Sequence, residues 1–173
     1  MAEQLTPQER LQPALLDRLT DEEPDKTQEP REQRVMSKSR LRQAVLRDLA
    51  WLLNATRVER GGSLEHLPFV RRSVINFGLP AQAGQTASTI GIEDIEREIR
   101  QAILDFEPRI LPESLRVQAM VEHSDLDRHN VIAVQIVGQL WAQPVPLELL
   151  VRTEIDLETG KVQISDLASS RVS

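Results

Sequence analysis

The chain has 173 residues with a net charge of −6 at pH 7, which fits one domain with a sizeable core. The acidic balance argues against a general nucleic-acid binder, which would normally show a basic face. The complete lack of cysteine excludes disulfide bonds and thiolate chemistry.

Residues 1–37 are predicted to form a flexible N-terminal arm with a short helix, and residues 38–173 the main domain. Leucines 11, 15, 16 and 19 are spaced for that helix, and the charged stretch 21–34 has almost nothing to bury. The helix is either a frayed surface helix or a segment that docks onto a partner and orders there. The start of the chain shows no signal peptide, and no apolar run approaches the roughly 20 residues that span a bilayer. We therefore expect a cytoplasmic protein without direct membrane insertion.

Two amphipathic stretches, residues 39–54 and 92–106, predict the two main helices. Trp51 lies beside the first apolar stripe, where it either covers the edge of the core or anchors a partner. We favour the core because large aromatic side chains are usually buried. The apolar stripes consist of Leu41, Val45, Leu49, Leu52 and Leu53 in the first helix, and of Ile92, Ile95, Ile99, Ala102, Ile103 and Phe106 in the second.

Beyond residue 110 the hydrophobic period changes from 3.6 to 2, which indicates strands. Residues 115–122 and 147–157 alternate between apolar and polar types. Residues 131–140 are apolar on both phases, as expected for a central strand covered on both faces. A tight turn at residues 158–160 leads to a short last strand. The prediction is an α+β fold, in which a small antiparallel sheet of three to four strands packs against the two main helices.

A first motif, SVINFGLP, occupies residues 73–80. Asn76 and Gly78 belong to the residue types that tolerate positive φ, so we expect an irregular packed turn with Val74 and Phe77 buried. This turn would cover the core.

A second motif follows the helix 92–106. Pro108 disfavours the α conformation at Glu107, so the helix should end near residue 106 or 107. The chain then leaves in an extended direction, with Glu107 and Arg109 on either side of a ring-fixed residue. The sequence leaves open whether these two charged side chains face a partner or each other.

The segments SVINFGLP and AILDFEPRI together resemble the baseplate-wedge family of contractile injection machines. That family includes the TssE component of type VI secretion and its phage-tail relatives, often called lysozyme-like. The resemblance extends roughly from Leu15 to the C-terminus. This sequence departs from the family pattern with Phe77 for the usual tyrosine and Ala81 for the usual acid. Any hydrogen bond of that hydroxyl or carboxylate is therefore absent here.

The resemblance implies a non-enzymatic subunit of a type VI secretion baseplate wedge. It would contact other wedge subunits and nucleate the contractile sheath by pairing strands with sheath subunits. Glu107, Pro108 and Arg109 match the family motif residue by residue and would bind a partner, since in relatives this motif lies against the helical core bundle of the wedge. The residues that match the structural motif are Ser73, Asn76, Phe77, Gly78, Leu79 and Pro80.

Two other functions fit the sequence less well: a peptidoglycan glycosidase, and an adaptor of another contractile-tail-like assembly. A glycosidase needs a carboxyl group with a raised pKa, and Arg109 would favour the ionised form of Glu107, the best candidate. We expect no catalytic residue, cofactor, small-molecule substrate or bound metal. The closely spaced residues His123, Asp125, Asp127 and His129 fit neither a zinc nor a calcium pattern.

Overall fold

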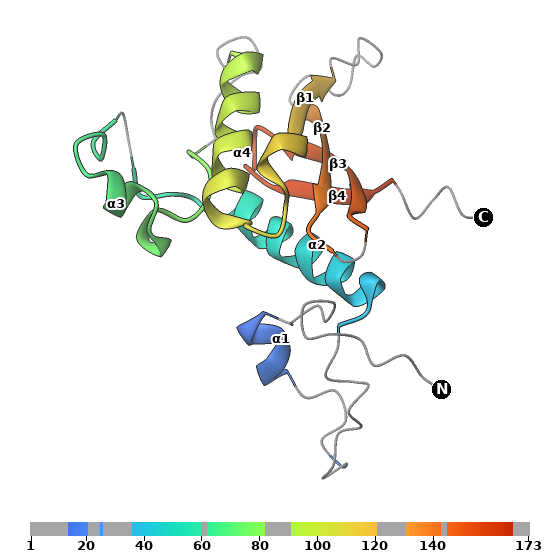
Figure 1. The fold of residues 1–173 in the computed structure, drawn as a ribbon. Helices are drawn as coiled ribbons and strands as arrows, with labels where there is room; N and C mark the ends of the chain where they lie inside the picture. The colour runs from blue at the N-terminus through green and yellow to red at the C-terminus, as the bar shows by residue number, and fades with distance from the viewer. Residues whose placement is uncertain are drawn as a thin grey trace, which may run out of the picture.

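The computed structural model describes residues 14–20, 25, 36–59, 62–81, 91–120, 131–142 and 145–167. It confirms the predicted α+β fold (Figure 1). The helices are α1 (Leu15–Leu19), α2 (Lys38–Asn54), α3 (Pro68–Arg71), the 3-10 turn η3 (Val74–Asn76), α4 (Ile92–Phe106) and the 3-10 turn η4 (Pro112–Ser114). The strands are β1 (Arg116–Met120), β2 (Val131–Leu140), β3 (Leu147–Asp156) and β4 (Val162–Asp166).

The four strands form one antiparallel sheet in the order β1-β2-β3-β4, so that β1 and β4 are its edges. The central strands β2 and β3 pair along ten residues each, whereas β1 and β4 are only five residues long. The β3–β4 hairpin closes at Gly160, whose φ of +71° is readily adopted only by glycine. The sheet is therefore a meander with two short edge strands.

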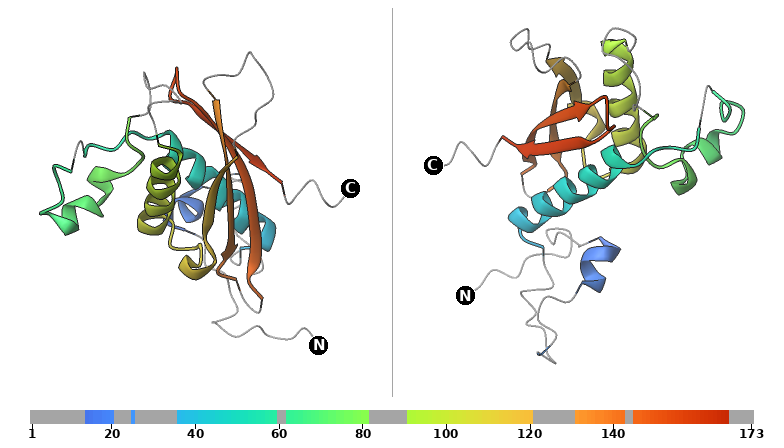
Figure 2. Two further views of the ribbon diagram at one scale, coloured as in Figure 1. Left: turned by 90° about the horizontal axis from the view of Figure 1, so that it is seen from above. Right: turned by 180° about the vertical axis from the view of Figure 1, so that it is seen from behind.

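Helix α4 lies beside β1 and helix α2 beside β4, and the two helices also contact each other (Figure 2). Alternate residues of every strand are buried against them. The predicted helix stripes form the other half of this core, although Ile92 and Phe106 at the two ends of α4 are only partly covered. The largest fully buried side chains include Leu49, Ile99, Ile103, Ile136, Leu140, Leu149, Ile155 and Leu157.

The prediction that β2 is covered on both faces is wrong for this chain. Its even-numbered residues are buried, but Val131 and Val137 on the opposite face are 39% and 38% exposed. Both long helices pack on the other face, so these valines are only partly covered, although Ala133 between them is 7% exposed. The outer face of β2 therefore carries two valines that are partly exposed to solvent.

Candidate functional site

The segment that follows α4 forms a tight turn that joins the helix to the sheet. The N–H of Glu107 donates to the carbonyl of Ile103 at 2.8 Å and ends the helix, as Pro108 predicts. The N–H of Ile110 then donates to the carbonyl of Glu107 at 3.2 Å. The ring of Pro108 at the tip is exposed, whereas the side chain of Glu107 is only 4% exposed.

The side chains of Glu107 and Arg109 face each other. Nε of Arg109 donates to one carboxylate oxygen of Glu107 at 2.6 Å, and Nη2 donates to the other at 2.5 Å. Nη2 also reaches the carboxylate of Asp48 on α2 at 2.5 Å. Burial of the guanidinium opposes its charge, but the hydrogen bonds and charges of Glu107 and Asp48 outweigh it and raise the pKa of Arg109. The motif is therefore held by an internal ion pair as well as by its turn.

This ion pair continues into a chain of charges that reaches the N-terminal helix. The second oxygen of Asp48 accepts a hydrogen bond from Nε of Arg47 at 2.9 Å. Nη1 of Arg47 donates to Asp17 of α1 at 2.7 Å. The guanidinium of Arg47 also lies 5.1 Å from the ring centre of Trp51, which is 52% exposed. Segments far apart in the sequence are thereby tied together beneath the turn.

The charge network is not complete within the described residues. Nη1 of Arg109 and Oδ2 of Asp17 are buried and make no hydrogen bond to them, whereas Nη2 of Arg47 is paired with a carboxylate oxygen of Asp48 at 2.8 Å. A buried polar atom without a partner costs free energy, because it has lost its hydrogen bonds to water. Two such atoms belong to this network, one on Arg109 in the turn and one on Asp17 of α1.

The motif at residues 73–80 is organised by Asn76, whose side chain is buried. Its Oδ1 accepts from the N–H of Glu59 at 2.9 Å, and its Nδ2 donates to the carbonyl of Arg71 at 3.0 Å. The amide thus ties η3 to α3 and to the segment after α2. Ser73 supports the same turn by donating from its hydroxyl to the carbonyl of Val70 at 2.8 Å.

The end of the motif is pinned to the C-terminus of α2. Leu79 is buried and exchanges backbone hydrogen bonds with Ala55 and Arg57 at 2.9 and 2.8 Å. Gly78 precedes it with φ of +116°, and a Cβ built there would lie 2.3 Å from the carbonyl oxygen of Ala55. Only glycine fits this close approach, and Pro80 continues the chain away from it.

The expectation that Val74 is buried is wrong. Val74 is 83% exposed, because the 3-10 turn directs Asn76 inward and Val74 outward. Phe77 is partly buried and packs edge-on against Phe106, with the ring centres 5.3 Å apart. This aromatic contact links the first motif to the helix that carries the second.

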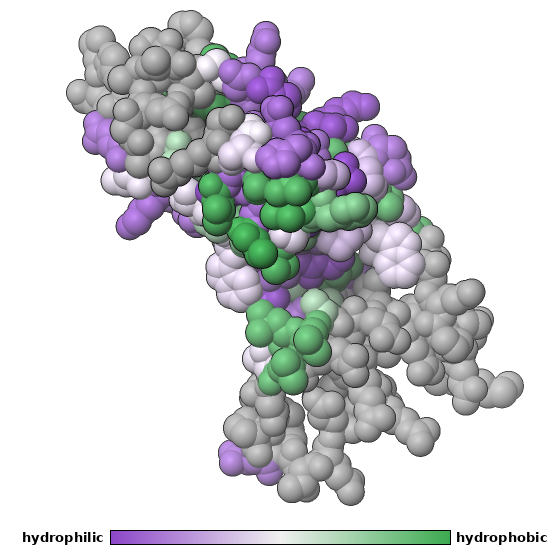
Figure 3. All heavy atoms as spheres, turned by 90° about the vertical axis from the view of Figure 1, so that its left-hand side faces the viewer, coloured by the Kyte–Doolittle hydropathy of each residue, from purple (hydrophilic) through white to green (hydrophobic). Residues whose placement is uncertain are grey.

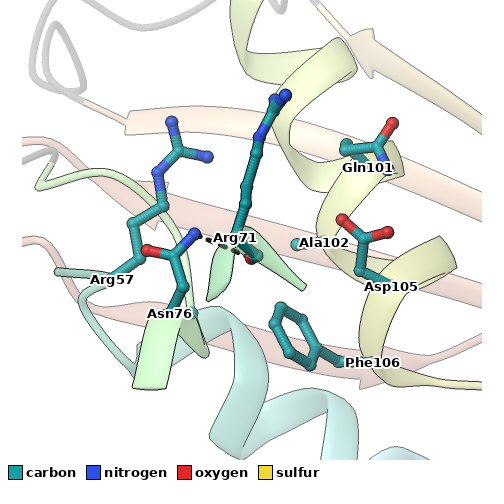
Figure 4. A pocket seen from close by; sticks show the side chains of 8 residues that line it. Arg57, Arg71, Asn76, Gln101, Ala102, Asp105 and Phe106 are labelled. Carbon is teal, nitrogen blue, oxygen red and sulfur yellow. Dashed lines mark hydrogen bonds between the residues drawn. The ribbon is translucent and has the colours of Figure 1, made fainter. Parts of the chain in front are cut away.

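A small pocket opens between the first motif and α4 (Figure 4). Two charged side chains border it: Arg57 donates to Glu98 at 2.5 Å, and Arg71 lies 3.6 Å from Glu59. Because these arginines have carboxylate partners, the pocket offers no unpaired cationic centre. Its walls are Arg57, Arg71, Asn76, Gly78, Gln101, Ala102, Asp105 and Phe106.

Apolar side chains are exposed on the side of the molecule that carries α3 (Figure 3). Phe69 is 91% exposed, and Val74 and Ile75 follow at 83% and 65%. A second apolar group lies on α1, where Leu15 and Leu19 are 70% and 73% exposed. The group over α3 was not predictable from the sequence, because its residues resemble a core segment in composition. Exposed apolar groups of this kind mark interaction surfaces.

The described residues hold no arrangement that suggests catalysis. Both carboxylate oxygens of Glu107 accept hydrogen bonds from Arg109, so this group is poorly placed to protonate a glycosidic oxygen. No group of three or more His, Cys, Asp or Glu residues in the described chain could hold a metal ion. The stretch from His123 to His129 lies outside the described residues.

Comparison with known proteins adds one finding. A family model described as baseplate wedge protein gp25 matches residues 39–145, which include both motifs, α2, α4, β1 and β2. No curated protein and no solved structure matches the chain.

Proposed function

Because this chain belongs to the family of baseplate wedge protein gp25, we propose that it is a structural, non-enzymatic subunit of a type VI secretion baseplate wedge. In this role it nucleates the contractile sheath by pairing a strand with sheath subunits. The family match over residues 39–145 carries the baseplate assignment. The open antiparallel sheet with two edge strands supports strand pairing, because an edge offers backbone groups to another chain.

In this proposal the turn of Glu107, Pro108 and Arg109 contacts the rest of the wedge, with Pro108 and Arg109 at its surface and the buried Glu107 holding Arg109 in place. The exposed Pro108 presents the turn, and the incomplete charge network beneath it supports a partner that supplies further polar groups. The two charged side chains can then face each other and still serve a partner contact. Glu107 and Arg109 bind each other and so hold the tip of the turn in a fixed shape for the partner.

We place the subunit in the cytoplasm, at the cytoplasmic side of the secretion machine. Among the described helices, none combines the length and the apolar content that crossing a bilayer requires. The exposed apolar groups over α3 and on α1 would serve contacts with other wedge proteins rather than with lipid.

Affinity purification from cells that carry the secretion system tests the wedge contact. The wild type should retain baseplate and sheath proteins, identified by mass spectrometry. The double variant Glu107→Ala/Arg109→Ala should lose the wedge proteins while it remains folded by circular dichroism.

A matched control removes another ion pair from the same helix region. Asp94 and Arg97 pair at 2.5 Å at the opposite end of α4, with side chains 59% and 67% exposed. Asp94→Ala/Arg97→Ala should retain all partners. Retention of wedge proteins by both double variants would remove the Glu-Pro-Arg contact from the proposal. Absence of baseplate and sheath proteins from the wild type would contradict the function itself, and a peptidoglycan-hydrolysis assay would then test the glycosidase alternative.

A further inference from the structure

The two edge strands differ in how many of their outward backbone N–H and C=O groups already make hydrogen bonds. In an antiparallel strand, the N–H and C=O of one residue both point to the neighbouring strand, and those of the next residue both point away. In β4 the outward residues are Val162, Ile164 and Asp166, since the carbonyl of Lys161 and the N–H of Leu167 bond to β3. In β1 the N–H of Ala119 donates to Glu96 of α4, which shows that the backbone N–H and C=O groups of Val117 and Ala119 are the ones that point away from β2.

Helix α2 closes the β4 edge at both ends. The side-chain amide of Asn54 donates to the carbonyl of Val162 at 2.9 Å and accepts from its N–H at 3.0 Å, as a neighbouring strand would. Arg42 holds the carboxylate of Asp166 by two hydrogen bonds of 2.6 Å and donates to the carbonyl of Glu148 at 2.7 Å. Only Ile164 lies between these two attachments. An added strand would have to detach α2 from β4.

The β1 edge lies beside α4, but only one side chain of that helix hydrogen-bonds to the outward backbone groups of β1. The carboxylate of Glu96 on α4 accepts from the N–H of Ala119 at 2.7 Å. The N–H and C=O of Val117 and the C=O of Ala119 make no hydrogen bond to the described residues. Three of the four outward groups thus have no hydrogen-bond partner among the described residues, although Val117 itself is only 9% exposed, and the fourth is held by a side chain that can rotate away.

The outer face of the sheet differs between the two edges. Near β1 it carries Met120, Val131 and Val137, each 38% to 40% exposed, together with the exposed polar residues Arg116 and Gln118. On β3, towards the other edge, Arg152 pairs with Glu154 at 3.5 Å, and β4 adds exposed polar residues. The side chains of an added strand would lie next to Met120 on β1, whereas the two valines lie one strand further in, on β2.

We propose that β1 is the edge to which the sheath strand is added, and that Glu96 closes this edge in the free subunit. The inference rests on the proposed strand pairing and specifies its place. A carbonyl of the incoming strand replaces the Glu96 carboxylate at the N–H of Ala119, while Val117 pairs through both of its backbone groups. The carboxylate returns to water. In the free subunit Glu96 limits edge-to-edge pairing between copies, because it puts a charge at an otherwise open edge.

Spin labelling distinguishes the two edges, and the absence of native cysteine makes the labelling site-specific. Gln118 on β1 and Gln163 on β4 are matched positions, because both are exposed outer-face glutamines on edge strands. Each is changed to cysteine in the full-length chain and labelled with a nitroxide. Purified sheath subunits of the same secretion system are then added. We expect the label at position 118 to be immobilised and the label at position 163 to keep its mobility.

The outcomes separate the inference from the proposed function. A complex that immobilises only the label at position 163 would overturn the choice of edge and leave strand pairing standing. A failure of the sheath subunits to bind either labelled chain or the unlabelled wild type would overturn the strand pairing on which the inference rests. Immobilisation at position 118 by an unlabelled copy of the chain, and not by the sheath, would show that the edge pairs with itself, which contradicts the proposal.

The Glu96→Ala variant tests the closing side chain. Without the carboxylate, the N–H of Ala119 is open to the sheath strand, so we expect binding about fivefold tighter than that of the wild type. Amide hydrogen exchange at Ala119 should become faster in the free variant. Glu93→Ala is the control, because Glu93 is an exposed acid on the same helix that does not cap β1. Unchanged or weaker sheath binding by folded Glu96→Ala would contradict the closing role.

Discussion

The turn after α4 is held by an ion pair between Glu107, Arg109 and Asp48, and only the first two of these residues could be brought together from the sequence. The proximity of Glu107 and Arg109 follows from their spacing around a proline. Asp48, which shares the guanidinium, lies 61 positions away and could not be assigned from the local pattern. Likewise, the type of Asn76 indicated a turn, but its buried hydrogen bonds to Glu59 and Arg71 depend on segments that meet only in the folded chain.

We predict that Arg109→Ala lowers the free energy of unfolding by about 1–3 kcal/mol, because it leaves the buried Glu107 carboxylate without its partner. Chemical denaturation measures the loss. Replacing Glu107 by glutamine in the same chain should recover part of it, since the uncompensated charge is then gone. A variant as stable as the wild type would show that the ion pair is not a structural element.

At Gly78 the backbone itself excludes a side chain. We expect Gly78→Ala to cost at least about 2 kcal/mol, because its φ of +116° and the carbonyl of Ala55 leave no space for a Cβ. Gly91→Ala is the comparison, since Gly91 has no positive φ and a Cβ there would meet only the flexible end of Asp94; it should cost less than about 1 kcal/mol. Equal thermal shifts for the two variants would be inconsistent with this geometry.

The helices and strands were predictable because each carries a periodic pattern of its own. The apolar stripes of α2 and α4 and the alternation in β1 and β3 specify which side faces the core. The outward direction of Val74 and the exposure of Val131 and Val137 were not predictable from pattern. Short apolar segments look alike whether the chain or a partner covers them. The residues whose burial was predicted wrongly, Val74, Val131 and Val137, therefore lie on the surface over α3 and on the outer face of the sheet, where we infer contacts with partners.

Helix α4 depends on its buried stripe, and Ile99 lies at the middle of it with 1% exposure. We predict that Ile99→Asp abolishes the cooperative unfolding transition, because it buries a charge without a partner. Ile92→Asp serves as the control: Ile92 is 38% exposed in the first turn, where the helix dipole favours an acid. Circular dichroism during heating measures both. A cooperative transition in Ile99→Asp would contradict the core assignment.

In the whole fold, backbone hydrogen bonds join the turn after α4 to the end of β2. The N–H of Trp141 at the end of β2 donates to the carbonyl of Arg109 at 2.7 Å, and the N–H of Leu111 donates to that of Gln139 at 2.8 Å. The turn that would contact the wedge thus pairs with the strand next to β1, the edge that would receive the sheath. A single chain could in this way place the first sheath strand at a fixed position on the baseplate.

The measurement that tests this account most directly is fluorescence imaging of a tagged sheath subunit in cells that lack this chain. We predict that extended sheaths are absent from these cells and return with the wild-type chain, but not with Glu107→Ala/Arg109→Ala. Sheaths that assemble equally often without the chain would contradict its role as the subunit from which the sheath grows.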